Sequence, residues 1–398
     1  MSDNVIDHVV RPTVYVWQRR WSAFHVCGVA GLTFAILLTM GLVLCRGLNP
    51  GVMLALTLSA VGIFLGLAML AKIIGGEEQL VSYHHEITIL VAGAVVLYQL
   101  HQPVLPYLDI TVLGIGLFRA CGRVGCLMVG CCFGRPWRWG VRYRSEHAAA
   151  GFAPYYVGVR LFPVQAVEAL WSLGIVCSGV VFVLTGHAPG TALAWSVVVY
   201  GLGRFAFEFA RGDPARPYLW GFSQAQWISL SLLFLVVSAG YVEILPFHAW
   251  HVGALTGMLL TLIAVASYRH LRDTASHELL HPRHVKEVAE ALTSISPWAT
   301  GDISVPRQTA SVRPCAGLAD IHIRETSLGV RISASHFTSP AGHLEHYALS
   351  SQGEMTQEAA NVLARLILQL KHATGSGAVL RGSRGVFHLF IRPLASEV

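Results

Sequence analysis

The sequence predicts an all-α polytopic membrane protein with a small soluble α+β module at its C-terminal end. Hydrophobic residues make up 54% of the 398 residues, and the mean hydropathy is +0.55. Charged residues make up only 13%, whereas soluble globular proteins have roughly 25%. The apolar residues are also grouped into long runs. These values exclude a disordered chain and argue against an ordinary soluble enzyme.

Eight apolar runs are candidates for membrane spans, because crossing the hydrocarbon takes about 20 helical residues. The runs are too long and too continuous for the alternating strands of a membrane barrel. The third is short, and the fourth carries Asp109, Arg119 and Arg123. The eight predicted spans are 23–45, 51–74, 86–100, 105–128, 163–185, 191–209, 227–244 and 250–268.

The composition changes after residue 268, where polar residues and prolines become frequent. Residues 330–333, 344–349, 379–380 and 386–391 have the patterns of strands, and residues 355–371 have helical spacing. A ββαββ module is therefore predicted, with no chemical motif. The predicted domains are an N-terminal tail (1–22), a membrane domain (23–270), a linker (271–326) and a soluble module (327–398).

Arg123 lies late in the fourth run, where a charge costs a few kcal/mol or more and calls for a reason. Nearby Gly122, Gly125 and Gly134 allow another backbone or a lipid headgroup to come close. Arg123 is thus a candidate ligand for an anionic group. A snorkelling interfacial anchor is an equally good interpretation.

Arg204, Glu208 and Arg211 follow helical spacing, so they are predicted to share one helix face. One interpretation is an anion site in which Glu208 orients the arginines, since guanidinium groups bind phosphate oxygens in pairs. The other is an ion-pair clamp between helices.

Two further polar groups open apolar runs. His84 stands at the start of the third run and is a candidate base, although a histidine there is more often an interfacial residue. Gln165 and Glu168 share a face at the start of the fifth run, a pair more typical of a structural role.

Four cysteines, Cys121, Cys126, Cys131 and Cys132, lie close together in the sequence. Their spacing matches no common zinc pattern, and no histidine accompanies them. We therefore expect no metal there.

In these motifs the chain resembles the prolipoprotein diacylglyceryl transferase family over roughly residues 20–245, the family's seven-helix body. The Tyr-Gly-x-x-Arg-Phe-x-x-Glu-x-x-Arg and Pro-x-Gln-x-x-Glu-Ala elements of the family are both recognisable. The segments that carry the resemblance are 82–84, 122–136 with 139–141, 163–169, 200–211 and 225–229. The eighth predicted span and the soluble module are additions to that body.

The resemblance implies transfer of a diacylglyceryl group from phosphatidylglycerol to the lipobox cysteine thiol in the signal-peptide region of a prolipoprotein. It implies no metal, cofactor or nucleic acid, and it places the chain in the bacterial inner membrane. The implied catalytic residues are His84 as base and Arg123 and Arg204 as phosphate ligands. The implied substrate-binding residues are Gly122, Gly125, Cys126, Gly134, Gln165, Glu208, Arg211 and Gln226.

The chain departs from the family pattern at several functional positions. His85 and Glu86 replace two glycines, Cys126 replaces an asparagine and Cys131 a glutamate, and Cys27 stands where the family has a tyrosine. The alternative function is therefore a catalytically degenerate membrane protein that binds phospholipid or lipoprotein. A small-molecule transporter is less favoured, because the sequence shows no internal repeat.

Eight spans place both termini on one side of the membrane, together with most arginine-rich loops. The positive-inside rule makes that side cytoplasmic. The resemblance instead implies that the phosphate-binding face, and with it the C-terminal module, is extracytoplasmic, and our prediction follows the resemblance.

Overall fold

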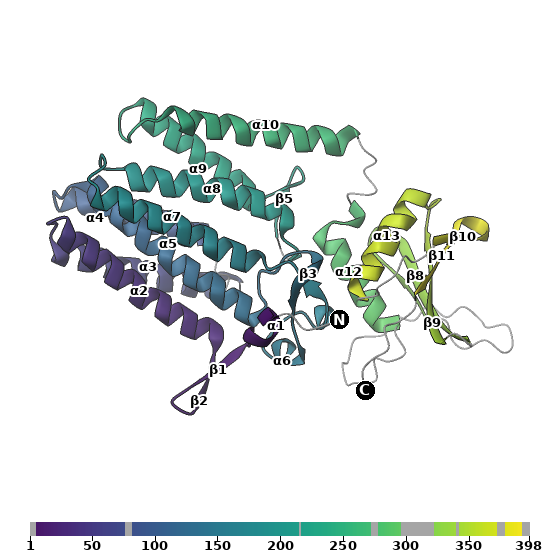
Figure 1. Cartoon of the computed structure of the whole chain (residues 1–398). Coiled ribbons are helices and arrows are strands. Elements are labelled where there is room, and N and C mark those ends of the chain that lie inside the picture. Colours follow the sequence, from purple (N-terminus) through teal and green to yellow (C-terminus); the bar gives the residue numbers. More distant parts are fainter. Residues whose placement is uncertain are drawn as a thin grey trace.

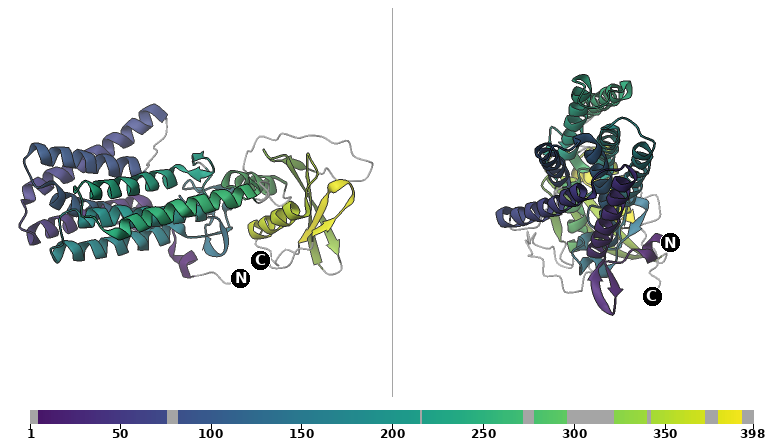
Figure 2. Two further views of the ribbon diagram at one scale, coloured as in Figure 1. Left: turned by 90° about the horizontal axis from the view of Figure 1, so that it is seen from above. Right: turned by 90° about the vertical axis from the view of Figure 1, so that its left-hand side faces the viewer.

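The computed structural model describes residues 5–75, 82–214, 216–271, 278–295, 322–339, 342–371 and 379–391. A bundle of long helices makes up most of this structure, and a unit of strands and helices lies beyond one end of the bundle (Figure 1, Figure 2). This arrangement confirms a helical, multi-pass membrane protein with a small strand-containing C-terminal region.

Among the described residues, seven helices are long and apolar enough to cross a membrane, whereas the sequence predicts eight spans. The seven are α2 (Ala23–Cys45), α3 (Pro50–Gly75), α5 (Val104–Val129), α7 (Val164–Leu184), α8 (Thr191–Phe207), α9 (Gln224–Tyr241) and α10 (Ala249–Leu271). The third predicted span forms helix α4 (Ser82–Gln99), but it does not belong to these seven. Its first turn holds two histidines and Glu86, which lower its hydropathy.

Helix α5 is the centre of the bundle and packs against α2, α4, α7 and α8. Glycines make these contacts close. A Cβ atom added at Gly114 would lie 2.6 Å from Thr39 Cγ2 of α2, and one added at Gly179 would lie 2.4 Å from Leu113 Cδ2. The faces of α5 that pack on α2 and on α7 therefore depend on glycine backbone in contact with a side chain of the neighbouring helix. A larger residue at Gly114 or Gly179 would prevent this close packing.

Short elements connect the helices at the end of the bundle that faces the C-terminal unit. They are α1 (Val5–Val9), β1 (Thr13–Val16), β2 (Arg19–Ser22), β3 (Pro136–Arg142), α6 (Ser145–Ala148), η1 (Pro154–Tyr156), β4 (Arg160–Leu161), η2 (Glu208–Ala210), β5 (Tyr218–Leu219) and β6 (Phe222–Ser223). Asp7 joins the N-terminal residues to this end: its carboxylate accepts a hydrogen bond from Arg142 N (3.0 Å) and pairs with Arg160 (3.1 Å).

The C-terminal unit is a five-stranded antiparallel sheet with strand order β10-β11-β9-β8-β7. Its elements are β7 (Ile323–Glu325), β8 (Val330–Ser339), β9 (Gly342–Ser351), α13 (Gln357–Leu370), β10 (Val379–Arg381), η3 (Ser383–Gly385) and β11 (Phe387–Ile391). The four predicted strands and the helix are present. The short strand β7 is additional, and helix α12 (Pro282–Ile295) forms within the segment expected to be a linker.

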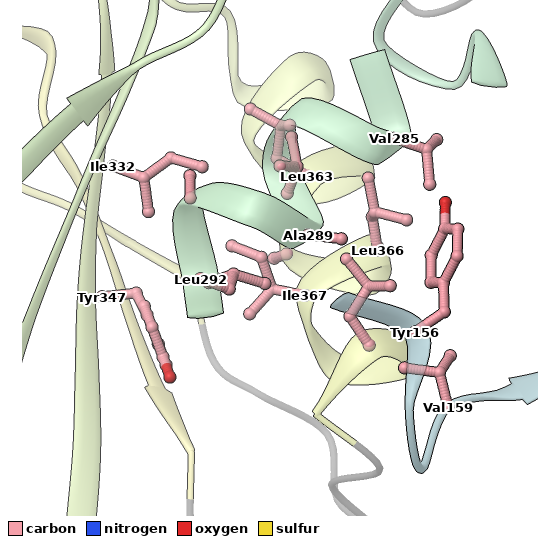
Figure 3. Close-up of a cluster of buried hydrophobic side chains, with 14 of the residues drawn as sticks. Tyr156, Val159, Val285, Ala289, Leu292, Ile332, Tyr347, Leu363, Leu366 and Ile367 are labelled. Atoms are coloured by element: carbon pink, nitrogen blue, oxygen red, sulfur yellow. The ribbon is translucent and has the colours of Figure 1, made fainter. Parts of the chain in front are cut away.

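One hydrophobic core joins this unit to the membrane body (Figure 3). Helix α12 supplies Val285, Ala289 and Leu292, and it contacts η1 of the body as well as the strands of the sheet. Tyr156 and Val159 of the body lie in the same cluster as side chains of α13. The C-terminal module is thus packed against the body rather than tethered by chain alone.

Candidate functional site

Glu168 is the centre of a buried group of charges inside the bundle. It lies in the second turn of α7 with a side chain only 1% exposed. Arg123 Nε of α5 is 2.5 Å from its Oε2, Arg204 Nη1 of α8 pairs with its Oε1, and Arg211 Nη1 is 3.6 Å from the same Oε1. These three arginines around Glu168 are called the arginine cluster below. Arg123 and the 204–211 segment lie far apart in the sequence, and the structure brings their arginines together on one carboxylate.

A second ring of polar contacts surrounds the arginine cluster. Arg204 Nη2 lies 2.7 Å from Glu208 Oε1, and Arg204 Nε donates to Tyr83 Oη at 2.7 Å. Asp213 accepts from Arg211 Nε at 2.9 Å and pairs with Arg216, which also pairs with Glu208. The arginines are therefore held in place by carboxylates on three segments.

The predicted single helix face for Arg204, Glu208 and Arg211 is wrong in one respect. Helix α8 ends at Phe207, Glu208 begins the 3₁₀ turn η2, and Arg211 has an extended backbone (φ −71°, ψ 141°). Arg211 pairs with Gly134 in an isolated β-bridge. A Cβ atom at Gly134 would lie 2.5 Å from Phe162 O, so this junction of loops requires glycine. Tertiary pairing with the 134–135 loop replaces the last helical turn.

The charges of the site do not quite cancel. Arg119 pairs with Glu86 at 2.7 Å and lies 3.5 Å above the ring of Tyr200, close to the arginine cluster. Together, five arginines (119, 123, 204, 211, 216) meet four carboxylates (86, 168, 208, 213), which leaves one positive charge. Arg211 Nη1 is also buried without a hydrogen-bond partner among the described residues. The site can thus accept an anionic oxygen.

Asp213 lies outside the membrane spans, at the edge of this network. Burial raises the pKa of its carboxyl group, but Arg211 and Arg216 outweigh burial and hold the pKa below its ordinary value. Asp213 therefore stays ionised and keeps Arg211 oriented.

His84 is not brought to the arginine cluster. Its side chain is exposed in the first turn of α4, and no hydrogen bond or ion pair joins its ring to the described arginines. Its neighbours make the contacts instead: Tyr83 bonds Arg204, Glu86 pairs with Arg119, and His85 is buried against Phe64 with ring centroids 4.8 Å apart.

The predicted glycines and glutamines take different positions. A Cβ atom at Gly122 would meet nothing within 4 Å, whereas Gly125 lies against Phe24 and Cys27 of α2. Gln165 is fully buried and donates to Cys131 O at 2.7 Å. Gln226 caps α9 by accepting from Ser223 N at 2.9 Å, and it donates to Phe205 O, beside Arg204. Gly122 leaves open space, and the others position the backbone around the cluster.

Three thiols form a separate group beside the arginines. The sulfur atoms of Cys126, Cys131 and Cys132 all lie within 4.8 Å of one another. Hydrogen bonds from the other two thiols, together with Arg211 and Arg123, hold the pKa of Cys132 well below its ordinary value despite burial.

The sequence pattern favours a structural role for Glu168, and no pattern selects Glu86, Arg119, Asp213 or Arg216. The signal for Glu168 was available, because a carboxylate inside an apolar run is as costly as an arginine and requires a partner. Asp213 and Arg216 lie in a loop, where charges are ordinary, so no sequence signal marks them.

With this geometry established, comparison with known proteins shows which family the body of the chain is similar to. Residues 77–242 match the family model of the prolipoprotein diacylglyceryl transferases. The matched region contains every member of the arginine cluster and its partners. The resemblance predicted from the sequence motifs is confirmed.

Three bacterial phosphatidylglycerol–prolipoprotein diacylglyceryl transferases are similar to this chain. The Clostridium tetani protein is 29% identical over 150 residues, which are 37% of this chain and 58% of that protein. One from Clostridium perfringens is 30% identical over 135 residues (33% and 49%), and one from Dehalococcoides mccartyi is 33% identical over 130 residues (33% and 48%). The alignments thus span about half the length of these relatives.

Proposed function

We propose that this protein transfers a diacylglyceryl group from phosphatidylglycerol to the lipobox cysteine thiol of a prolipoprotein. The observation that carries the proposal is the arginine cluster: three buried guanidinium groups share the one carboxylate of Glu168, and Nη1 of Arg211 makes no hydrogen bond among the described residues. Relatives named for this reaction match the region that contains the cluster.

The reaction needs cations where its leaving group develops charge. The acceptor thiolate attacks a glyceryl carbon, the bond from that carbon to the phosphate oxygen breaks, and glycerol phosphate leaves with the electron pair. Arg123 and Arg204 are the proposed phosphate ligands, with Glu208 and Arg211 as support. In a site with little water, such stabilisation supplies several kcal/mol.

The phosphate has to compete with the carboxylates that hold the arginines. Glu168 pairs with three guanidinium groups at once. Each guanidinium group can therefore keep its ion pair with Glu168 and donate its remaining N–H groups to a substrate phosphate. Gly122, whose Cα faces open space, is the proposed position of closest approach for the headgroup.

His84 remains the proposed base for the acceptor thiol. Because its ring is exposed and separate from the cluster, this role requires the thiol to lie between the start of α4 and the arginines. The substrate site is proposed to be shaped by the contacts described above for Gly125, Gly134, Gln165 and Gln226, and by the thiol of Cys126.

We further propose that α4 also crosses the bacterial inner membrane, which gives eight spans. Helix α2 begins at one end of the bundle, directly after β2. Helix α5 ends at that same end, where the loop to β3 follows it. A chain that starts and finishes at the same end of the bundle has crossed the membrane an even number of times. The four helices α2, α3, α4 and α5 give such an even number.

A phosphatase reporter fused after residue 398 tests whether the C-terminal module is extracytoplasmic, as proposed. Phosphatase activity supports this location, and inactivity together with an active cytoplasmic reporter contradicts it.

A transfer assay tests the proposed function. Purified protein in nanodiscs is incubated with isotope-labelled phosphatidylglycerol and a lipobox peptide, and the thioether product is measured by mass spectrometry. Arg123→Ala and Arg204→Ala should each lower kcat/KM by about 10²–10³, the usual cost of one charge-stabilising group. Arg46→Ala is the matched control, because Arg46 is exposed at the end of α2 and should leave the rate unchanged.

The outcomes separate the two candidate functions. Product formation that survives Arg123→Ala and Arg204→Ala would show that the site is elsewhere. Retention of phosphatidylglycerol without product from any lipobox peptide would favour the degenerate lipid-binding protein.

A further inference from the structure

We propose that Cys126, Cys131 and Cys132 form a binding site for a thiophilic divalent cation of the zinc type. These residues are called the cysteine trio below. Neither the proposed transfer reaction nor the relatives' names include a metal.

The end of helix α5 builds the trio. Cys126 lies in the last turn of α5, and Gly130 caps the helix in the left-handed conformation at φ +82°. This residue turns the chain back so that Cys131 and Cys132 return to Cys126. Only glycine fits, because a Cβ atom there would lie 2.8 Å from Phe152 Cδ2 and 3.1 Å from Tyr143 Cδ1. A short reverse turn, rather than a CxxC spacing, therefore brings the three sulfurs together.

The distances suit a metal. Zinc–sulfur bonds are about 2.3 Å, so the sulfurs of a tetrahedral site lie about 3.8 Å apart. The three sulfurs are within 4.8 Å of one another and thus need only a small inward shift to share one ion. Cys131 is exposed, which gives an ion a path from solvent, and Cys126 is buried.

The surroundings support the trio in two ways. Gln165 donates to the carbonyl of Cys131 at 2.7 Å and fixes the turn from behind. Cys132 has φ +56°, a conformation that is uncommon for a residue with a side chain and that stays in place only when its surroundings require it. Such backbone strain is typical of functional positions.

The neighbouring charges match a thiolate-bound ion. Three thiolates and one Zn²⁺ ion carry a net charge of −1. Arg123 and Arg211 both interact electrostatically with Cys132, so their guanidinium groups attract a negatively charged complex at this position. A bare cation beside these arginines would be repelled, whereas the complex with three thiolates is attracted.

Three protein ligands leave a fourth position open in a tetrahedral site, as in catalytic zinc sites. Resting on the proposed function, we assign this position to the acceptor thiol of the lipobox cysteine. A zinc ion there would lower the pKa of the bound thiol, whose proton would pass to water at the exposed Cys131 side. The thiolate would then attack the glyceryl carbon, and glycerol phosphate would leave with the electron pair of the broken C–O bond. This assignment supplies an activated thiol although His84 lies apart from the cluster.

Cobalt substitution tests the site without relying on activity. Reduced, purified protein in nanodiscs is titrated with Co²⁺, and thiolate-to-cobalt charge-transfer absorption is recorded in the near ultraviolet. We expect one Co²⁺ per chain, displaced by Zn²⁺. Cys126→Ser, Cys131→Ser and Cys132→Ser should each weaken binding by more than about tenfold, since even outer-shell changes cost 10–100-fold.

Cys45→Ser is the matched control, because Cys45 is an exposed thiol at the far end of α2 and should leave the spectrum unchanged. Absence of the absorption band, or a band that persists in all three trio variants, would overturn the proposal. Thermal unfolding of each variant confirms that a lost band does not reflect a lost fold.

A second titration separates this site from the proposed function. Adding a lipobox peptide with cysteine should change the cobalt spectrum, and the same peptide with serine should not. A cobalt band without any peptide effect would retain the metal site and overturn the assignment of its fourth ligand. A peptide effect without transfer in the thioether assay would retain both and contradict the proposed reaction.

Discussion

At the scale of single residues, the buried charges explain one another. An isolated arginine in an apolar bundle is expensive, but Arg123, Arg204 and Arg211 share the carboxylate of Glu168. Each arginine on its own is compatible with an interfacial anchor. Their convergence from three segments on one carboxylate is the observation that favours a binding site.

Glu168→Gln should destabilise the protein by about 3–5 kcal/mol, because it leaves buried guanidinium groups without their shared partner. The measurement is thermal unfolding in detergent micelles. Glu146→Gln is the control, since Glu146 is exposed in α6 outside the bundle. Equal unfolding temperatures for the two variants would contradict the central place given to Glu168.

At the scale of elements, sequence patterns predicted what local chemistry determines. The spacing of residues 355–371 predicts α13, and Thr356 begins this helix by accepting from Ala359 N at 3.1 Å. The patterns failed where tertiary contacts decide. The end of helix α8 at Phe207 depends on the β-bridge between Arg211 and Gly134. No local sequence pattern at either residue predicts this pairing.

In the candidate site, too, features that depend on local sequence were predicted and features that depend on tertiary contacts were not. The arginines and Glu208 were found because charges inside apolar runs need a reason. The cysteines were noticed, but no metal was expected there, because the closure of the cysteine trio depends on the left-handed turn at Gly130 rather than on a ligand spacing.

Two glycine substitutions at the end of α5 should behave differently. Gly130→Ala places a Cβ atom in a left-handed turn against Phe152, so it should cost more than about 1–2 kcal/mol of unfolding free energy. Gly122→Ala meets open space in a helix and should be neutral or stabilising by about 0.5–1 kcal/mol.

Thermal unfolding checks the pair, and the transfer assay adds a second readout. If Gly122 leaves room for a headgroup, Gly122→Ala should lower transfer while preserving stability. A Gly130→Ala protein as stable as Gly122→Ala would contradict the turn described here.

At the scale of the whole molecule, the C-terminal module and the membrane body share one core through α12. Residues far apart in the chain meet there, which no local pattern could predict. Of the expected linker, residues 282–295 form a packed helix that brings the sheet to the end of the bundle carrying the arginine-rich loops.

This junction should weaken in mild acid. His284 of α12 is buried, bonded to Leu279 O (2.8 Å) and Thr326 Oγ1 (3.0 Å), and burial lowers the pKa of its imidazole. The unfolded chain binds a proton at about pH 6.5, above the pKa of the folded state. The contribution of His284 to stability is therefore complete above about pH 6.5 and is lost as the pH falls toward the lower, folded value.

Hydrogen exchange of α12 between about pH 7.5 and pH 5.5 measures this effect, after correction for the intrinsic exchange rate. His284→Gln should flatten the pH dependence, whereas His270→Gln, at an exposed position of α10, should leave it unchanged. An unchanged slope in His284→Gln would assign the effect to another group.

The most direct test of the account is whether the arginine cluster holds an anionic headgroup. Native mass spectrometry of the protein released from mixed phosphatidylglycerol and phosphatidylcholine nanodiscs measures which lipid it retains. We predict preferential retention of phosphatidylglycerol, reduced by more than about tenfold in Arg204→Gln, since a hydrogen-bonded charge contributes about 1.5–3 kcal/mol, and unaltered in Arg46→Gln. Equal retention of phosphatidylglycerol by the wild-type protein and Arg204→Gln would contradict the account.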